Sequence, residues 1–269
     1  MLWIELSCIL LLLLGLALRA RTPGLRDWAR DAPIILVGAW LAEDTCIRAY
    51  AFYDYHAPWH LVLDKMPLLI AAIWIFVVLS ARDVAAQLAP KRTILLVFLL
   101  VWYDASLIEP IATHVGLWRW HELGPFNVPW IGMLGWAIYA AAVLGWLQRL
   151  PQHLRWLAVI FAPFTTHVVL LCLWWGALRW LPQVRPSDGA MTVGSAVIAS
   201  GLAFFALRSR RRVLLSLLLP RIGPALFFFA LLWLYAAPLS LVLYSLAFAL
   251  PWLAVTRWSA VSLQVRQSV

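Results

Sequence analysis

Long apolar segments follow one another along almost the whole chain, and most of the charge lies in the short loops between them. A helix that crosses the hydrocarbon core of a bilayer needs about 20 apolar residues. Eight stretches approach this length, near residues 2–19, 33–51, 61–80, 93–115, 129–148, 155–180 and 190–207, and within 213–256. The sequence therefore predicts an all-α polytopic membrane protein, a bundle of seven or eight transmembrane helices.

The composition supports a lipid environment. Of 269 residues, 64% are hydrophobic and 12% are charged. Average soluble domains are about 45–50% apolar and about 25% charged, so a soluble globular enzyme is excluded. Loops between the predicted helices are no longer than about a dozen residues, too short for a separate domain. We expect one transmembrane domain over residues 1–269.

The two ends of the chain leave questions about the helices. Arginines follow segment 2–19 and no basic residue precedes it, which indicates a retained helix and not a cleaved signal peptide. The apolar run from 224 to 252 fits one long kinked helix or two short ones. Pro220 or Pro238 can provide the break.

Basic residues concentrate in alternate loops, after the first, third, fifth and seventh segments. Fourteen of the twenty-one lie there: Arg19, Arg21, Arg26, Arg30, Arg82, Lys91, Arg92, Arg149, Arg155, Arg208, Arg210, Arg211, Arg212 and Arg221. The other loops and the C-terminal tail hold Arg48, Lys65, Arg119, Arg179, Arg185, Arg257 and Arg266. By the positive-inside rule, the loops after helices 1, 3, 5 and 7 are expected to be cytoplasmic and the N-terminus to lie on the opposite side, in a bacterial inner membrane. Because the basic residues lie between apolar segments and not on one solvated face, we expect them to interact with anionic lipid and not with nucleic acid.

Polar residues are unevenly distributed. Eight of the twelve acids and four of the six histidines lie between residues 43 and 122. The part from 137 to 269 reads as scaffold helices, apart from Thr165, Thr166 and His167. Chemistry is therefore expected in the N-terminal half.

An ionisable group inside a span costs about 2.5–3.5 kcal/mol and usually faces the bundle interior. Among the acids within the predicted spans, the candidates for a site are Glu43, Asp104 and Glu109. Asp104 and Glu109 point about 140° apart on a regular helix. They share a face only if the turn before Pro110 is distorted; otherwise one faces a site and the other makes an interhelical hydrogen bond.

A fourth acid, Asp44, has an alternative explanation. Arg48 lies four residues further on, the spacing of an intrahelical ion pair. Glu43 has no comparable partner in its own helix.

Aromatic residues accompany these acids and could form the walls of a catalytic site. Four indoles lie close together, those of Trp118, Trp120, Trp130 and Trp136, and further aromatic residues lie in the same half of the chain: Trp40, Tyr50, Phe52, Tyr53, Tyr55, Trp59, Trp74, Trp102 and Tyr103. Many Trp and Tyr side chains of a membrane protein form belts at the bilayer interface. The remainder suit another role: a carboxyl group in a dry cavity favours its protonated form and can act as a general acid, and aromatic faces stabilise cations. Such a site can make a carbocation from an apolar alkene.

Metal and nucleotide sites have little support. His56 and His60 have the i, i+4 spacing of a metal pair, but Pro58 interrupts the helix that would align them. Three cysteines without close spacing provide neither a disulfide framework nor a zinc site. No phosphate-binding loop or serine-hydrolase motif is present. No metal and no cofactor is therefore expected.

The stretch 104–120 contains an acid, an acid-Pro pair and Gly-x-Trp-x-Trp, followed by Gly124 to Pro129 and Gly135-Trp136. This arrangement resembles the signature of the membrane carotenoid-biosynthesis family that includes the CruF-type carotenoid hydratases. An upstream block that includes Trp40 and Glu43 is similar to the family's preceding helix pair. The resemblance covers residues 38–136. The chain departs from the pattern at Glu109, where the family has Asp, and in the five-residue spacing of the two acids.

The resemblance implies acid-catalysed hydration of a terminal isopropylidene C=C of a polyene, through a tertiary carbocation. Glu109 or Asp104 would donate the proton, and Glu43 or the other acid would position the water. The expected substrate contacts are Trp118, Trp120, Tyr55, Trp136 and Trp40. No redox cofactor is implied, and other carotenoid-pathway enzymes are possible partners.

Two other functions use the same residues. In an isoprenoid or carotenoid cyclase, an internal alkene captures the cation in place of water. In a proton-coupled transporter or binding protein for a hydrophobic substrate, the acids form a proton relay. The sequence shows no inverted repeat that would favour a transporter, and a purely structural role leaves the buried acids unexplained.

Overall fold

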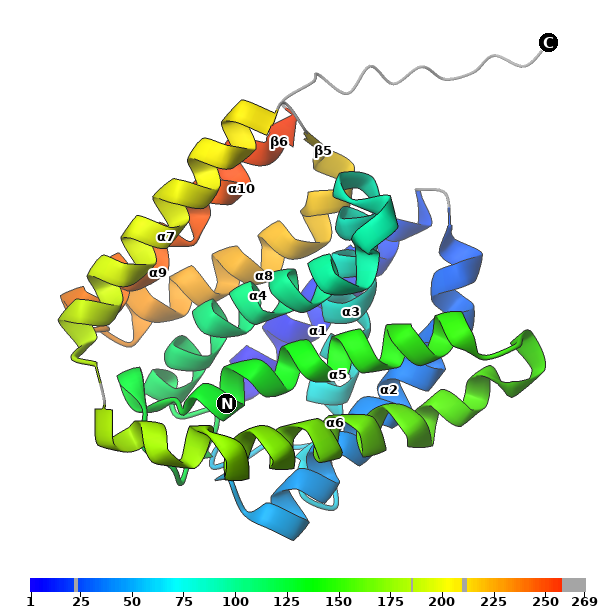
Figure 1. The fold of residues 1–269 in the computed structure, drawn as a ribbon, viewed down its shortest axis with the longest axis horizontal. Helices are drawn as coiled ribbons and strands as arrows, with labels where there is room; N and C mark the ends of the chain where they lie inside the picture. The colour runs from blue at the N-terminus through cyan, green and yellow to red at the C-terminus, as the bar shows by residue number, and fades with distance from the viewer. Residues whose placement is uncertain (22–23, 185, 210–211, 258–269) are drawn as a thin grey trace.

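The computed structural model describes residues 1–21, 24–184, 186–209 and 212–257. Within these residues, seven helical spans are long and apolar enough to cross a membrane, which confirms the all-α polytopic prediction (Figure 1). They contain α1 (Leu2–Ala20), α3 (Leu68–Leu88), α4 (Thr93–Val115), α5 (Trp130–Arg149), α6 (Ala158–Gly176), α7 (Asp188–Ser209) and α8 (Leu215–Leu234).

Two helices begin at other residues than predicted. The span expected at 33–51 is α2 (Leu25–Tyr50), with Pro33 inside it, because the polar residues before Pro33 find ionic partners at the end of the bundle. The span expected at 61–80 begins only at 68. Its first residues instead form a hairpin of β2 (Val62–Leu63) and β3 (Met66–Pro67), which turns at Asp64 with a φ of 59°.

The ambiguous C-terminal stretch forms separate helices. α8 ends at Leu234, and Pro238, in an extended conformation, precedes α9 (Leu239–Ala247) and α10 (Ala249–Val255). Pro238 is therefore the break, whereas Pro220 lies inside α8. The strand β6 (Thr256–Arg257) pairs in parallel with β5 (Val213–Leu214), so the chain returns to the end of the bundle where α8 begins (Figure 1).

α3, α4 and α8 contact one another, and other helices pack beside them in two groups. α4, α5 and α6 lie against one another in sequence order, and α2 packs on α3 and α6. α7 packs against α9 and α10 at the other edge, where exposed apolar side chains such as Val197, Phe204 and Phe205 suit contact with lipid (Figure 1). The buried core lies between α2, α3, α4 and α5.

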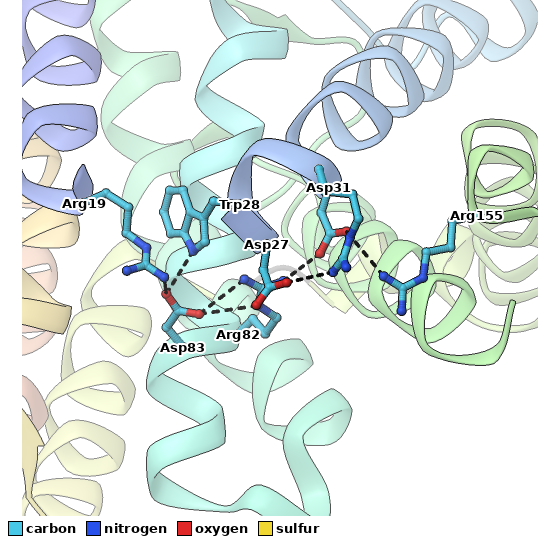
Figure 2. A network of polar contacts seen from close by, with 8 residues as sticks. Arg19, Asp27, Trp28, Asp31, Arg82, Asp83 and Arg155 are labelled. Atoms are coloured by element: carbon cyan, nitrogen blue, oxygen red, sulfur yellow. Dashed lines mark hydrogen bonds and ion pairs between the residues drawn. The ribbon is translucent and has the colours of Figure 1, made fainter. Parts of the chain in front are cut away.

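One end of the bundle is joined by an ionic network (Figure 2). Asp83 at the end of α3 contacts Arg19 of α1 at 3.4 Å and accepts a hydrogen bond from the Trp28 indole at 3.0 Å. Asp31 of α2 pairs with Arg82 at 2.9 Å and lies 3.9 Å from Arg155, which follows α5. Charges after the first, third and fifth helices therefore meet at the same end of the molecule.

The start of α8 lies at this end too, because the Leu214 backbone N–H donates to Gln87 near the end of α3 at 3.3 Å. Two assignments from the charge pattern are wrong. Arg221 was expected in the loop after the seventh segment, but it lies inside α8. Arg257 was expected away from the end where most basic residues gather, but the pairing of β6 with β5 places it at that end. The predicted loop residues Arg185, Arg210, Arg211 and Arg266 lie outside the described residues.

Candidate active site

Glu109 is buried in the middle of the protein and accepts three hydrogen bonds from indoles. It is 1% exposed. Trp118 and Trp120 donate to its Oε2 at 2.8 Å each, and Trp136 donates to Oε1 at 2.7 Å. A carboxylate has about four acceptor positions, so one position on Oε1 remains open.

The chain after α4 brings two of these indoles back to the helix. Pro110 lies inside α4 without ending it, and the helix continues to Gly116, whose φ of 78° turns the chain. The following strand β4 (Arg119–Trp120) pairs with β1 (Tyr53–Asp54), a short segment after α2. Trp136 comes from α5. Two separate segments thus supply the donors around one acid, and the pairing with β1 holds one of them.

Glu43 on α2 has a matching environment. Tyr53 donates to its Oε2 at 3.1 Å, and the Tyr55 hydroxyl makes a short hydrogen bond to the same oxygen. Trp74 of α3 donates to Oε1 at 2.5 Å. Two of the three partners are therefore hydroxyl groups, which can accept as well as donate, whereas all partners of Glu109 are donors only.

The six donors form ring pairs that connect the two acids, and we call them the aromatic cage. In each pair, one ring donates to Glu43 and the other to Glu109. The pairs are Trp74 with Trp136 at 4.9 Å between ring centroids, Tyr53 with Trp120 at 4.7 Å, and Tyr55 with Trp118 at 6.0 Å. These separations are typical of favourable aromatic contacts. Both carboxyl groups are thus held by one packed set of rings.

The acids and the cage line a mainly apolar cavity of about 680 Å³, part of which is open to the outside; we call it the site cavity. Its other walls come from α2, α5 and α6 and include Ala39, Ala42, Cys46, Tyr139, Thr166, His167 and Leu170. Gly132 is necessary here, because a Cβ at this position would lie 2.6 Å from the Trp120 ring. The cavity combines two carboxyl groups with aromatic walls and few other polar atoms.

Six of the eight predicted site residues come together in this cavity. They are Glu43, Tyr55, Glu109, Trp118, Trp120 and Trp136. Trp40 does not line it, since its indole points to the β2–β3 hairpin and donates to the Leu63 carbonyl at 3.2 Å. Its assignment as a substrate contact is therefore wrong for this cavity.

Asp104 is also outside the site cavity. α4 stays helical through residue 109, so Asp104 and Glu109 face different sides, and Asp104 makes an ion pair with Arg221 of α8. This is the interhelical alternative anticipated for a regular helix. Asp44 likewise pairs with Arg48 at 3.1 Å and accepts from the Lys65 backbone N–H at 2.9 Å. Neither acid is placed to act in the site cavity.

The Asp104–Arg221 pair gives a prediction about stability. The two side chains are 20% and 10% exposed. Asp104→Leu should destabilise the protein by about 3 kcal/mol, because it leaves a buried guanidinium without its counter-charge. Adding Arg221→Met should recover most of this loss, measured as the melting temperature in detergent. A double variant no more stable than Asp104→Leu would contradict the role of the pair.

Several lining residues were not among the eight predicted site residues. Tyr53 and Trp74 donate to Glu43, and Tyr139 lies in the part expected to be scaffold. Thr166 and His167 line the cavity too, and they were the exceptions noted in that part of the chain. His167 is notable because neither ring nitrogen is exposed or hydrogen-bonded, although the Ala42 carbonyl lies close enough to interact electrostatically. A lone histidine and two threonines inside an apolar span were the available signal for this wall.

The histidines at 56 and 60 do not form a helical pair. They lie in the loop between α2 and α3, where the His60 ring contacts Glu5 at 2.5 Å and its backbone N–H donates to the same side chain at 2.8 Å. Within the described residues, no three His, Cys, Asp or Glu side chains are grouped closely enough to hold a metal ion. The contact ties the start of α1 to this loop.

An ion pair fastens the β1–β4 strands over the site. The His121 Nδ1 lies 2.6 Å from the Ala51 carbonyl oxygen, and its Nε2 lies 2.8 Å from Asp54. Both partners are acceptors, so both ring nitrogens must carry protons. The hydrogen bond to Asp54 raises the pKa of His121. Burial raises the pKa of Asp54, but hydrogen bonds and charge from His121 and Arg119 outweigh it and lower that pKa.

This pair predicts a pH dependence of the strands. The His121 contribution is complete below the ordinary histidine pKa of 6.5 and is lost as the pH rises through its raised value in the folded protein. The Asp54 contribution is lost as the pH falls through its lowered value. The protection of the His121 amide, which donates to Phe52, should therefore fall at alkaline pH when its hydrogen exchange is compared with the intrinsic rate at each pH. Asp54→Asn should remove most of this pH dependence, and a protection that is the same at all pH values would refute the prediction.

A search of protein families, of curated proteins and of solved structures finds no match to the chain. Its function is therefore inferred from the chemistry of the site.

Proposed function

We propose that the protein is a membrane-embedded hydratase of carotenoid biosynthesis, which adds water to a terminal isopropylidene C=C of a polyene. One observation carries this proposal: a buried carboxyl group, Glu109, and a half-buried one, Glu43, each holding three hydrogen bonds, face one mainly apolar cavity through a shared aromatic cage. An acid, a second acid and aromatic walls are what proton-initiated carbocation chemistry requires. No redox step is involved.

The reaction has two bond-forming steps. Protonation breaks the O–H bond of one carboxyl and forms a C–H bond at the less substituted alkene carbon, which leaves a tertiary cation and a carboxylate. Water then forms a C–O bond with the cation and gives a proton to the second carboxylate. The cage rings face the cation, and aromatic faces stabilise positive charge where water is scarce. Return of that proton to the first acid restores the starting state.

The hydrogen-bond partners suggest which acid does what. The indoles around Glu109 donate only, so their hydrogen bonds strengthen when Glu109 becomes a carboxylate. This favours Glu109 as the proton donor. Glu43 is bonded to Tyr53 and Tyr55, whose hydroxyls can reverse from donor to acceptor when it takes up a proton. Glu43 is accordingly assigned as the carboxylate that positions the water and accepts its proton.

Cyclisation and transport remain the rival functions. A cyclase would use the same cation but exclude water from it. A proton-coupled carrier would use the two acids as a relay and release its ligand unchanged. The three functions differ in the mass or in the absorption of what leaves the protein: only the hydratase adds mass, and only the cyclase shifts the absorption at unchanged mass.

The experiment for this proposal is expression in a bacterial host that accumulates lycopene, followed by chromatography and mass spectrometry of the extracted pigments. The hydratase predicts pigments heavier by one or two waters. An isomer of unchanged mass with shifted absorption would indicate cyclisation. Unaltered lycopene would contradict the carotenoid assignment. Partners are other enzymes of the same pathway, which would deliver the polyene or use the alcohol.

The charge distribution supports an orientation. We propose that the end of the bundle with the ionic network faces the cytoplasm of a bacterial cell and that the N-terminus lies on the other side, in accordance with the positive-inside rule. In a variant without native cysteines, Leu123→Cys should react with an impermeant thiol reagent in intact cells, whereas Lys91→Cys should not. The opposite pattern would reverse the orientation.

A further inference from the structure

A second cavity lies between α1, α3, α4 and α8. Its empty space amounts to about 1140 Å³, which includes the part that is open to the outside, and we call it the chain cavity. Its walls are largely aliphatic and aromatic, as shown by Ile4, Ile73, Val77, Leu107, Ile108 and Phe228. No part of the mechanism above uses it.

The chain cavity adjoins the site cavity. Trp74, Trp118 and Trp136 line both of them. Their indole N–H groups are engaged by the two acids, so these rings are fixed in position. A molecule in the chain cavity therefore touches the same rings that surround the reacting group.

The polar groups of the chain cavity mostly satisfy one another. Arg221 donates to Ser80 at 2.9 Å, pairs with Asp104 and lies over the Trp252 ring at 5.1 Å. Two buried donors of this lining, the Arg221 Nε and the Trp59 Nε1, have no hydrogen-bond partner within the described residues. The remaining hydrogen bonds of the Asp104–Arg221 pair are made within the protein, so an adjacent hydrocarbon displaces little hydrogen bonding.

We infer that the chain cavity holds the hydrocarbon body of a long linear polyene whose terminal group lies in the site cavity. The inference rests on the proposed function and extends it to the length of the substrate. Burial of apolar surface is favourable in proportion to the area removed from water, so an apolar wall beside the reacting end favours binding of a long chain. α1 and α8 carry exposed apolar side chains such as Leu10 and Leu226, which places this cavity beside helices that contact lipid.

Filling the chain cavity should therefore select against long substrates. Cys8→Phe on α1 and Ala225→Phe on α8 each place a ring in it without altering a residue of the site cavity. Matched controls are Cys172→Phe and Ala196→Phe, at exposed positions of α6 and α7. Each purified variant is compared by size-exclusion elution to establish folding.

Two readouts test the inference. Hydration of a long polyene should fall at least about tenfold in the filled variants, while a short isoprenoid with the same terminal group should react as in the wild type. Quenching of tryptophan fluorescence should show weaker binding of the long polyene, independently of turnover. Unchanged binding and turnover of the long polyene in both filled variants, or equal loss for both substrates, would overturn the inference.

The two proposals fail in distinguishable ways. In one outcome the wild type binds the polyene but hydrates neither substrate, and the filled variants no longer bind it. The hydratase function is then rejected, and binding of the polyene in the chain cavity is supported. If the wild type does not bind the polyene, the chain cavity is wrong. If the wild type hydrates both substrates and filling has no effect, only the chain cavity is rejected.

Discussion

Replacing Glu43 by Gln should reduce the hydration rate by about 10²–10⁴-fold, the usual contribution of general acid–base catalysis, while the protein stays folded. The amide can keep every contact of the carboxyl. Its oxygen accepts from Trp74, and its NH₂ group donates to the oxygens of Tyr53 and Tyr55. The amide cannot take up the proton of the attacking water, so only the chemistry is lost.

The measurement is product formation per folded protein, with the melting temperature in detergent as the second reading. Glu122→Gln is the control, since Glu122 lies in the loop after β4 and does not line the site cavity. Unchanged turnover in Glu43→Gln would remove Glu43 from the mechanism. A large fall in melting temperature would show that the tyrosines do not reverse.

Glu109→Gln should abolish hydration and also lower stability. Here the amide has no orientation that satisfies its partners, because its NH₂ group must face the N–H of at least one indole. A buried donor left without an acceptor costs about 1–3 kcal/mol. Glu109→Gln should thus melt earlier than Glu43→Gln, although both changes replace a carboxyl by an amide.

A double-mutant cycle isolates this effect. In the Glu109→Gln variant, the amide oxygen is expected to keep Trp118 and Trp120, which leaves the NH₂ group against Trp136. Trp136→Phe removes that N–H, so it should cost less stability in the Glu109→Gln background than in the wild type. Additive losses would contradict the proposed clash, and full activity of Glu109→Gln would reject Glu109 as the proton donor.

The sequence predicted the acids better than their surroundings. Glu43 and Glu109 stand out because ionisable groups inside a span are costly, and helix geometry anticipated that Asp104 and Glu109 would diverge. The indoles of Trp118, Trp120 and Trp136 were proposed from the concentration of aromatic residues in that region and from the family resemblance. These inferences need no knowledge of contacts between distant segments.

The parts that were missed depend on contacts between distant segments. Trp74 and Tyr53 meet Glu43 from other elements, and His167 reaches the cavity from α6. Arg221 was assigned to a loop because its partner, Asp104, lies more than a hundred residues away in the sequence. Hydropathy locates helices but contains no information about which of their faces meet.

The most direct test of the central claim is turnover of lycopene by the purified protein in water labelled with heavy oxygen and with deuterium. The hydratase predicts a tertiary alcohol that carries one heavy oxygen from water and one non-exchangeable deuterium on the adjacent carbon for every end modified. Product of unchanged elemental composition, or recovery of lycopene without either label, would contradict water addition at the site between Glu43 and Glu109.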